Sequence, residues 1–371
     1  MNFSIFAIVF STVMTLLTLL ISRRFVRKLH FSKKTKLFIN IFLAINLLGV
    51  AGYMFARYNP TIPNWAYFLL SIPIGVIFVL FIATIFYELS SRILNIIPIN
   101  EERRTFFKKT LDISSVALAG SVNAKAMYNA RHIEIEKVEI KIKNLKQSYN
   151  IVQLSDIHIG GLVNKEFISN LVKKVNALNP DIVVITGDMV DTKLDYAKEA
   201  LDELKNLKSK YGNYFIVGNH EYFHGVVSII DYVNTLNIKT LENENVYIGE
   251  KEKGFFLAGV YDVMGYRIES YKPDLYKALI GTDEYPIVLL AHQPKFIEEV
   301  KDVDLVLSGH THGGQIVPFN FIVKLAQPYI KGLHQHNDYT QIYVNKGTGF
   351  WGPPMRLGAS SEITNITIIP S

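Results

Sequence analysis

The chain has 371 residues, 49% of them hydrophobic, with a formal net charge of +6 and no cysteine. The lack of cysteine excludes disulfides, thiolate nucleophiles and sulfur-based metal sites, so a metal would have to be held by His, Asp, Glu or Asn. Up to Thr110 there are 13 Lys or Arg against 3 acidic residues, and beyond it 26 against 30. The basic excess therefore lies in the N-terminal third, among long apolar runs, which favours membrane flanks over a nucleic-acid surface.

Three uncharged apolar runs cover residues 3–22, 37–56 and 62–87. Each approaches or exceeds the roughly 20 residues that a helix needs to cross a bilayer. One such run could be a cleaved signal peptide, but three in succession do not fit that interpretation. Buried helices of a soluble protein are the alternative, although core helices are seldom free of charge on every face over this length. We therefore predict a multi-pass membrane domain over residues 1–110 with about three transmembrane helices.

The connections between these runs predict their orientation. The stretch "RRFVRKLHFSKKTK" after the first run holds seven Lys or Arg, whereas the second connection holds only Arg57. Because positive residues are retained in the cytoplasm, the N-terminus should face outward and the third helix should run inward.

Residues 111–132 leave two interpretations open, a linker lying on the membrane or a weak fourth membrane segment. They are only mildly apolar, with several serines. The preceding "RRTFFKK", which begins at Arg103 and Arg104, is similar to a twin-arginine export signal. If this hypothesis holds, everything after it lies on the extracytoplasmic face of the cell membrane.

From residue 133 to the C-terminus, short apolar runs alternate with helix-like segments. Examples are "YNIVQLSD", "EFISNLVKKVNAL", "DIVVITGD" and "VDLVLSGH". This alternation predicts an α/β domain, with a sheet packed on both faces, over residues 133–371.

Polar residues with metal-ligating side chains follow strand after strand in this domain. The motifs are "SDIH", "TGD", "GNHE", "LAH" and "GHTH", and they supply Asp156, His158, Asp188, Asn219, His220, His292, His310 and His312. In open α/β sheets ligands bind beyond the carboxyl ends of the strands, so we expect these side chains to meet at one edge. A carboxylate between neutral imidazoles suits a pair of divalent cations about 3.5 to 4 Å apart.

In this order the motifs make the chain resemble the calcineurin-like metallophosphoesterase family over residues 133–371, with N-terminal transmembrane helices as in its membrane-anchored members. The resemblance implies two stacked mixed β-sheets flanked by helices, and two divalent ions, manganese, zinc or iron. One ion would be bound by Asp156, His158, Asp188 and His312, and the other by Asp188, Asn219, His292 and His310. His220, with Asn219, would act on the scissile phosphate, and Asp191 would support the site without binding an ion.

The resemblance further implies hydrolysis of phosphate mono- or diesters by a metal-activated water. The membrane anchor favours a lipid or cell-envelope substrate. Arg356 is a candidate substrate contact, and Phe350 and Trp351 could form an apolar lip beside the site. The alternative is a non-catalytic membrane protein whose phosphoesterase domain only binds a phosphorylated ligand or partner.

Overall fold

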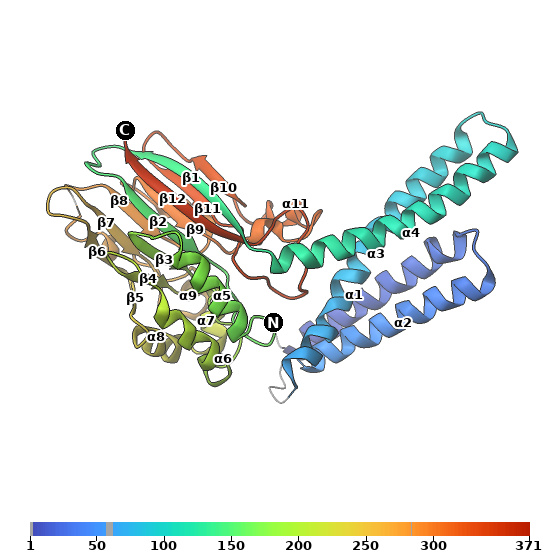
Figure 1. The fold of residues 1–371 in the computed structure, drawn as a ribbon, viewed down its shortest axis with the longest axis horizontal. Helices are drawn as coiled ribbons and strands as arrows, with labels where there is room; N and C mark the ends of the chain where they lie inside the picture. The colour runs from blue at the N-terminus through green and yellow to red at the C-terminus, as the bar shows by residue number, and fades with distance from the viewer. Residues whose placement is uncertain (1–2, 57–61, 283) are drawn as a thin grey trace. The chain divides into compact units, whose positions relative to one another are not determined.

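The computed structural model describes residues 3–56, 62–282 and 284–371, so Arg57 lies outside the described residues. The chain forms two compact units. One contains the residues up to 128 together with 352–355, and the other contains 129–351 and 356–371. Figure 1 shows the ribbon, with the N-terminal helices in blue and the strands in green to red.

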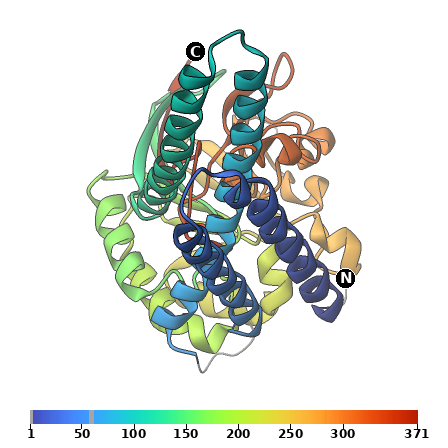
Figure 2. The same cartoon turned by 90° about the vertical axis from the view of Figure 1, so that its right-hand side faces the viewer.

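The first unit contains three helices that are long and apolar enough to cross a membrane, as predicted. They are α1 (Phe3–Arg24), α2 (Lys33–Ala56) and α3 (Asn64–Ile96), with a short 3-10 turn η1 (Val26–Lys28) between the first two. They lie side by side (Figure 2) and bury a common core that includes Ile21, Leu43 and Ile77. Leu48 on α2 is 72% exposed, as expected for a side chain that faces lipid.

The fourth helix, α4 (Glu101–Arg131), runs without interruption through the stretch predicted as a linker or weak membrane segment. It is not among the candidate membrane spans in the described part of the chain. The guanidinium of Arg104 donates to the carbonyls of Leu94, Ile97 and Ile99 and so closes the end of α3. Further along, the buried carboxylate of Asp112 accepts hydrogen bonds from Tyr87 Oη at 2.8 Å and from the backbone of His30.

The second unit contains two six-stranded mixed sheets, which confirms the predicted fold class. The first sheet has the order β1-β12-β2-β3-β4-β5, and β2 to β5 run parallel. Its strands are β1 (Glu134–Ile142), β2 (Tyr149–Leu154), β3 (Ile182–Thr186), β4 (Asn213–Ile216), β5 (Ile238–Thr240) and β12 (Glu362–Pro370). The C-terminal strand β12 lies between β1, to which it is parallel, and β2, to which it is antiparallel.

The second sheet has the order β10-β11-β9-β8-β7-β6, with β7, β8, β9 and β11 parallel and an antiparallel strand at each edge. Its strands are β6 (Glu244–Ile248), β7 (Phe255–Gly259), β8 (Ile287–Leu290), β9 (Leu305–Ser308), β10 (Gly332–Gln335) and β11 (Gln341–Val344).

Alternating side chains of each strand fill different layers of the core. On β3, Ile182 and Val184 pack between the two sheets, whereas Val183 and Ile185 pack under the helices of the first sheet. On β9, Leu305 points between the sheets and Val306 points to the outer face of the second sheet. This period of two explains why both strands are continuous apolar runs, because each is buried on both faces.

Helices and 3-10 turns connect the strands and cover the sheets. They are α5 (Lys165–Asn176), α6 (Leu194–Leu201), η2 (Asp202–Asn206), α7 (Asn219–His224), α8 (Val226–Asn234), α9 (Met264–Ile268), α10 (Leu275–Ala278), η3 (Pro294–Glu299), η4 (His312–Gly314) and α11 (Asn320–Val323). In Figure 1, α5 to α8 lie beside the first sheet. The loops that leave β2, β3, β4, β8 and β9 carry every residue predicted as a metal ligand.

Candidate metal centre

The backbone of the candidate ligands is unusual. Asp156, His158, Asp188, His310 and His312 all have a positive φ, between 49° and 68°. Non-glycine residues seldom adopt this left-handed conformation, which costs of order 1–3 kcal/mol and is found preferentially at functional sites. The turn lets each strand stop abruptly and direct its next side chain across the sheet edge. The five residues are among 14 such non-glycine residues in the described part of the chain.

Backbone contacts hold the loops after β2, β3 and β4 together. Asp156 N–H donates to Gly187 O, and His158 N–H donates to Asp188 O, both at 3.0 Å. Gly218, between β4 and α7, lies so close to the Asp188 carboxylate that a Cβ there would overlap it. The glycine before Asn219 is therefore required by close approach.

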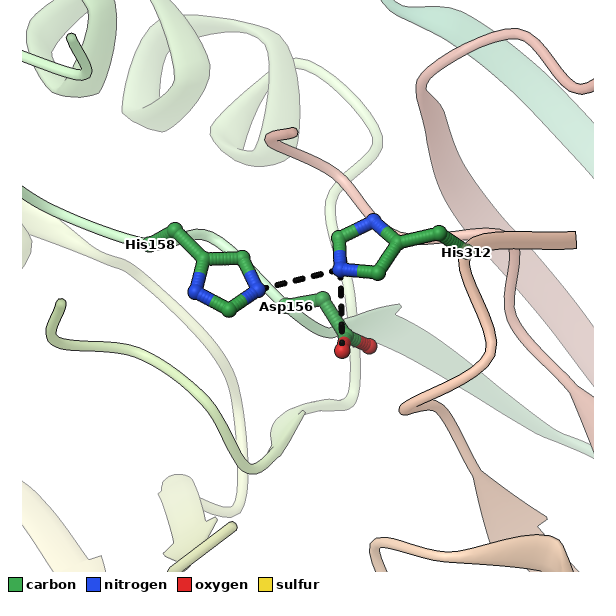
Figure 3. A group of neighbouring side chains, drawn as sticks. All are labelled: Asp156, His158 and His312. Atoms are coloured by element: carbon green, nitrogen blue, oxygen red, sulfur yellow. Dashed lines mark hydrogen bonds and ion pairs between the residues drawn. The ribbon is translucent and has the colours of Figure 1, made fainter. Parts of the chain in front are cut away.

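The first group of candidate ligands consists of Asp156, His158 and His312, whose ligand atoms all lie within 4.8 Å of one another. Figure 3 shows the two imidazoles turned toward each other, with Nε2 atoms 3.0 Å apart, and Asp156 Oδ1 3.5 Å from His312 Nε2. All three side chains are buried. Two ring nitrogens and a carboxylate oxygen that converge in this way can bind one cation.

The second group consists of Asp188, His292 and His310. His292 donates Nδ1–H to the carbonyl of Thr186 at 2.7 Å, which fixes the ring and leaves Nε2 directed at Asp188 Oδ2, 3.2 Å away. Asn219 Oδ1 lies 3.3 Å from the same Nε2. Asp188 Oδ2 is also 4.0 Å from His158 Nε2, so this carboxylate lies between the two groups, as expected for a bridging ligand.

A third group contains His220 and Asp191, with His158 at its edge. His220 Nδ1 lies 2.7 Å from Asp191 Oδ1, and His224 Nε2 lies 3.4 Å from the same oxygen. The other ring nitrogen of His220 is 3.8 Å from Asp188 Oδ2, and its backbone N–H donates to Asp188 Oδ1 at 2.8 Å. His220 is thus held by one carboxylate and placed beside the other.

The polar atoms of this site fit divalent cations. Asp156 Oδ1, His158 Nδ1 and His310 Nδ1 are buried and have no hydrogen-bond partner among the described residues. Buried polar atoms without a partner are rare in folded proteins, because each loses the hydrogen bond that water would give it. Cations coordinated by Asp156 in the first group and by His310 in the second would compensate for that loss at these two residues, and the donor set of oxygen and imidazole nitrogen suits manganese, zinc or iron.

Burial and mutual charge set the protonation of the ligands. Burial lowers the pKa of His158 and of His310 to about 3, so both imidazoles are neutral, as metal binding requires. Burial disfavours the charge of Asp188, but His292 and His220 hold the pKa of this carboxyl well below its usual range. His220 is also buried, yet Asp188 and Asp191 raise its pKa to about 9.

The position of Arg356 in the structure differs from the predicted one. This residue was expected to contact substrate, but its side chain is completely buried. Its guanidinium donates to the carbonyls of Lys346, Gly347 and Gly349 in the loop after β11, and Nη2 lies 2.9 Å from His312 Nδ1. Because a guanidinium cannot accept a hydrogen bond, His312 Nδ1 must be the acceptor. Burial and the charge of Arg356 hold the pKa of His312 well below its usual range, so Arg356 helps to keep a ligand neutral.

Two further residues shape the site although the sequence analysis gave them no role. The buried carboxylate of Glu221 accepts the backbone N–H groups of Gly218, Asp188 and Val190 at 2.7 to 3.0 Å and so holds the loop after β3 against α7. Ser155 Oγ donates to Asp156 Oδ2 at 2.6 Å. The signal for Glu221 was the last letter of "GNHE", whereas no sequence signal marks Ser155 as a partner of Asp156.

The chain is similar to known proteins over most of its length. The family model of calcineurin-like phosphoesterases matches residues 149–314. An uncharacterized metallophosphoesterase of Helicobacter pylori is 39% identical over 329 residues, 87% of this chain and 88% of that protein. One of Campylobacter jejuni is 33% identical over 99% of both chains. A transmembrane protein with metallophosphoesterase domain from Danio rerio is 38% identical over 68% of this chain and 60% of its own length.

Proposed function

Because the chain belongs to the calcineurin-like metallophosphoesterase family, we propose that it is a membrane-anchored enzyme that hydrolyses phosphate mono- or diesters at a dinuclear metal centre. The observation that carries the proposal is the convergence of two ligand groups on either side of Asp188, with His220 beside them. A domain that only binds a phosphorylated partner would not need a histidine held in this position.

In the proposed centre, one ion would be bound by Asp156, His158, Asp188 and His312, and the other by Asp188, Asn219, His292 and His310. Two divalent cations in these positions would supply an activated water and neutralise the charge of the phosphate. Asp188 lies between the two groups and can serve both. The protein holds the remaining ligands through hydrogen bonds to their other atoms, as between His292 and the carbonyl of Thr186.

His220 is the proposed proton donor. Asp191 accepts the hydrogen of Nδ1 and fixes the ring, which leaves Nε2 as the atom next to Asp188. From there, a protonated His220 can pass its Nε2 proton to the departing alkoxide of the ester. Asn219 precedes it at the start of α7 and lies within reach of the second ligand group.

We further propose that the phosphoesterase domain lies on the extracytoplasmic face. The carboxylate of Asp112 on α4 accepts a hydrogen bond from the backbone N–H of His30, which lies in the basic connection predicted to be cytoplasmic. From Asp112 to Arg131, α4 continues for 19 residues, about 28 Å at 1.5 Å per residue. That length matches the roughly 30 Å hydrocarbon core of a bilayer. A crossing by this weakly apolar helix fits the export hypothesis based on Arg103 and Arg104.

Turnover of bis(p-nitrophenyl) phosphate by the full-length protein in nanodiscs tests the proposed activity. Hydrolysis should require added manganese and should be lost in Asp188→Asn, which removes the charge shared by both ligand groups. Asp195→Asn, at an exposed position in the first turn of α6, is the matched control and should hydrolyse as the native chain does. Metal-independent turnover, or none in the native chain with manganese, zinc or iron, would refute the proposal and favour a binding domain.

A further inference from the structure

A segment of the phosphoesterase domain exposes an unusual density of large apolar side chains. Within residues 317–325, here called the apolar segment, the exposed ones are Val317 (40%), Phe319 (46%), Phe321 (63%), Ile322 (59%) and Leu325 (88%). The segment contains α11 and joins η4 to the chain that leads to β10. Soluble surfaces rarely gather so many apolar side chains without a function, so this segment marks an interaction site.

The apolar segment is built onto the metal centre. Gly314, two residues after His312, has φ +81°, and a Cβ there would overlap the backbone of Asn320, the first residue of α11. The helix therefore rests directly on the loop that carries two candidate ligands. Gln315, the residue after Gly314, donates its side-chain N–H to the carbonyl of Trp351 at 2.8 Å. Its side-chain oxygen accepts the backbone N–H of Trp351 at 3.1 Å.

Trp351 continues the apolar surface toward the reaction site. Its ring centroid lies 6.1 Å from that of His220, and the ring of Phe223 lies 5.9 Å from His220 on α7. Trp351 is 40% exposed and Phe223 is 63% exposed. Phe350, by contrast, is buried, so only one of the two aromatic residues proposed as a lip is available at the surface.

The same chain indicates what covers this surface. Its three candidate membrane helices keep the phosphoesterase domain next to a bilayer at all times, so even weak contacts with lipid become effectively intramolecular. Exposed Lys324 and Lys331 lie in and just beyond the apolar segment. Aromatic and aliphatic side chains flanked by lysine are typical of protein surfaces that enter the headgroup region of anionic membranes. We propose that the apolar segment docks on the bilayer beside the metal centre.

Docking of this segment also defines the substrate class, a step that rests on the proposed function. With Trp351 and Phe223 between His220 and the lipid surface, the ester that reaches the centre is borne by a lipid, with its phosphate at headgroup depth and its acyl part in the bilayer. The enzyme then has no need to extract the whole lipid, because the centre is brought to the phosphate.

Fluorescence quenching by lipid tests the docking without any turnover. The chain has no cysteine, so Leu325→Cys places a single environment-sensitive fluorophore in the apolar segment of the full-length protein in nanodiscs of phosphatidylcholine and phosphatidylglycerol. Tyr276→Cys, on α10 and 84% exposed in the native chain, is the control. Doxyl-labelled phospholipid should quench the probe at 325 several-fold more than the probe at 276. Equal quenching at the two positions would overturn the docking. Disulfide-linked pairs at position 325 without quenching would also overturn it and would indicate that a second copy of the chain covers the segment.

A second measurement addresses the substrate class. In the same discs, Leu325→Glu should lower kcat/KM for a lipid-anchored aryl phosphodiester several-fold more than for its soluble analogue. An equal decrease for both esters would overturn the lipid-borne substrate. Absence of turnover with either ester in the native chain would instead overturn the proposed function, and with it the substrate class, while the quenching result would still decide the docking.

Discussion

The imidazole of His220 lies against the carboxylate of Asp191, with Nδ1 2.7 Å from Oδ1, and both side chains are largely buried. His224 Nε2 lies 3.4 Å from the same oxygen. Burial opposes the negative charge of Asp191, but the two histidines, His220 above all, hold its pKa well below its usual range. Asp191 therefore carries a full charge at neutral pH and fixes the ring of His220 through that charge.

Replacement of Asp191 should impair the reaction more than the fold. In Asp191→Asn the charge that orients His220 is lost, and we expect kcat for an aryl phosphodiester to fall by about 10- to 100-fold, the usual effect of removing a residue that positions a ligand or a catalytic group. KM should change much less. The exposed Asp195→Asn is the control for the loss of one negative charge, and a native kcat in Asp191→Asn would show that His220 needs no such partner.

Metal binding should stabilise the fold. Metals bind the native arrangement and hardly the unfolded chain, so manganese at 100 times its dissociation constant should add about 2.7 kcal/mol to the free energy of unfolding for each ion bound. Thermal unfolding of the native chain with chelator and with manganese measures the difference. An Asp188→Asn variant should show a much smaller rise in Tm on addition of manganese, and a rise as large as that of the native chain would place the ions elsewhere.

Arg356 should be required for the stability of the loops around His312. Its five donors are used by backbone carbonyls and by His312 Nδ1, and lysine cannot reach so many acceptors from one point. Because each buried acceptor left without a partner costs about 1–3 kcal/mol, Arg356→Lys should lower the free energy of unfolding by about 3 kcal/mol or more. Denaturant titration of Arg356→Lys and of the exposed Arg267→Lys, which should be neutral, measures this cost. Equal stability of the two variants would contradict it.

Gly314 and Gly281 offer a matched comparison, because both have φ +81°. Alanine at either position should lower the free energy of unfolding by about 1–2 kcal/mol, because a residue with a Cβ is strained in the left-handed conformation. At Gly281 a Cβ would meet nothing within 4 Å, whereas at Gly314 it would overlap the backbone of Asn320. Gly314→Ala should therefore be clearly the less stable variant and should release α11 from η4. A free energy of unfolding equal to that of Gly281→Ala would show that this close approach is not maintained in solution.

The side of the membrane can be determined with one cysteine. The native chain has no cysteine, so Ser371→Cys introduces a single reactive thiol at the exposed C-terminal residue. If α4 crosses the bilayer, a maleimide that cannot pass the cytoplasmic membrane should label Ser371→Cys in cells whose cytoplasmic membrane is intact. Labelling that requires lysis of that membrane would place the phosphoesterase domain in the cytoplasm and would refute the export hypothesis for Arg103 and Arg104.

The sequence predicted much of the fold because its patterns are local. Apolar runs identified the three N-terminal helices, and motifs at the ends of parallel strands indicated which side chains would gather, since those strands end at one edge of a sheet. The position of β12 between β1 and β2 was not predictable in this way, because it depends on pairing between strands more than 200 residues apart.

Other properties of the site depend on contacts that no motif contains. The positive φ of Asp156 and of His312 is not marked by any residue in their motifs, since neither is a glycine. The burial of Arg356 follows from the fold of the chain after β11, which places seven acceptor contacts around one guanidinium. The substrate contact was predicted for Arg356 because a guanidinium binds phosphate well, and no motif shows that this guanidinium is used by the protein's own carbonyls.

The measurement that tests the central proposal most directly is the number of metal ions bound per chain. Full-length protein is loaded with manganese in nanodiscs, freed of excess ions and analysed for metal and protein together, beside Asp188→Asn and the Asp195→Asn control. We expect two ions per chain in the native protein and the control, and a loss of both in Asp188→Asn. A native chain that retains no divalent ion, or an Asp188→Asn variant that retains two, would contradict a dinuclear centre at this edge of the sheets.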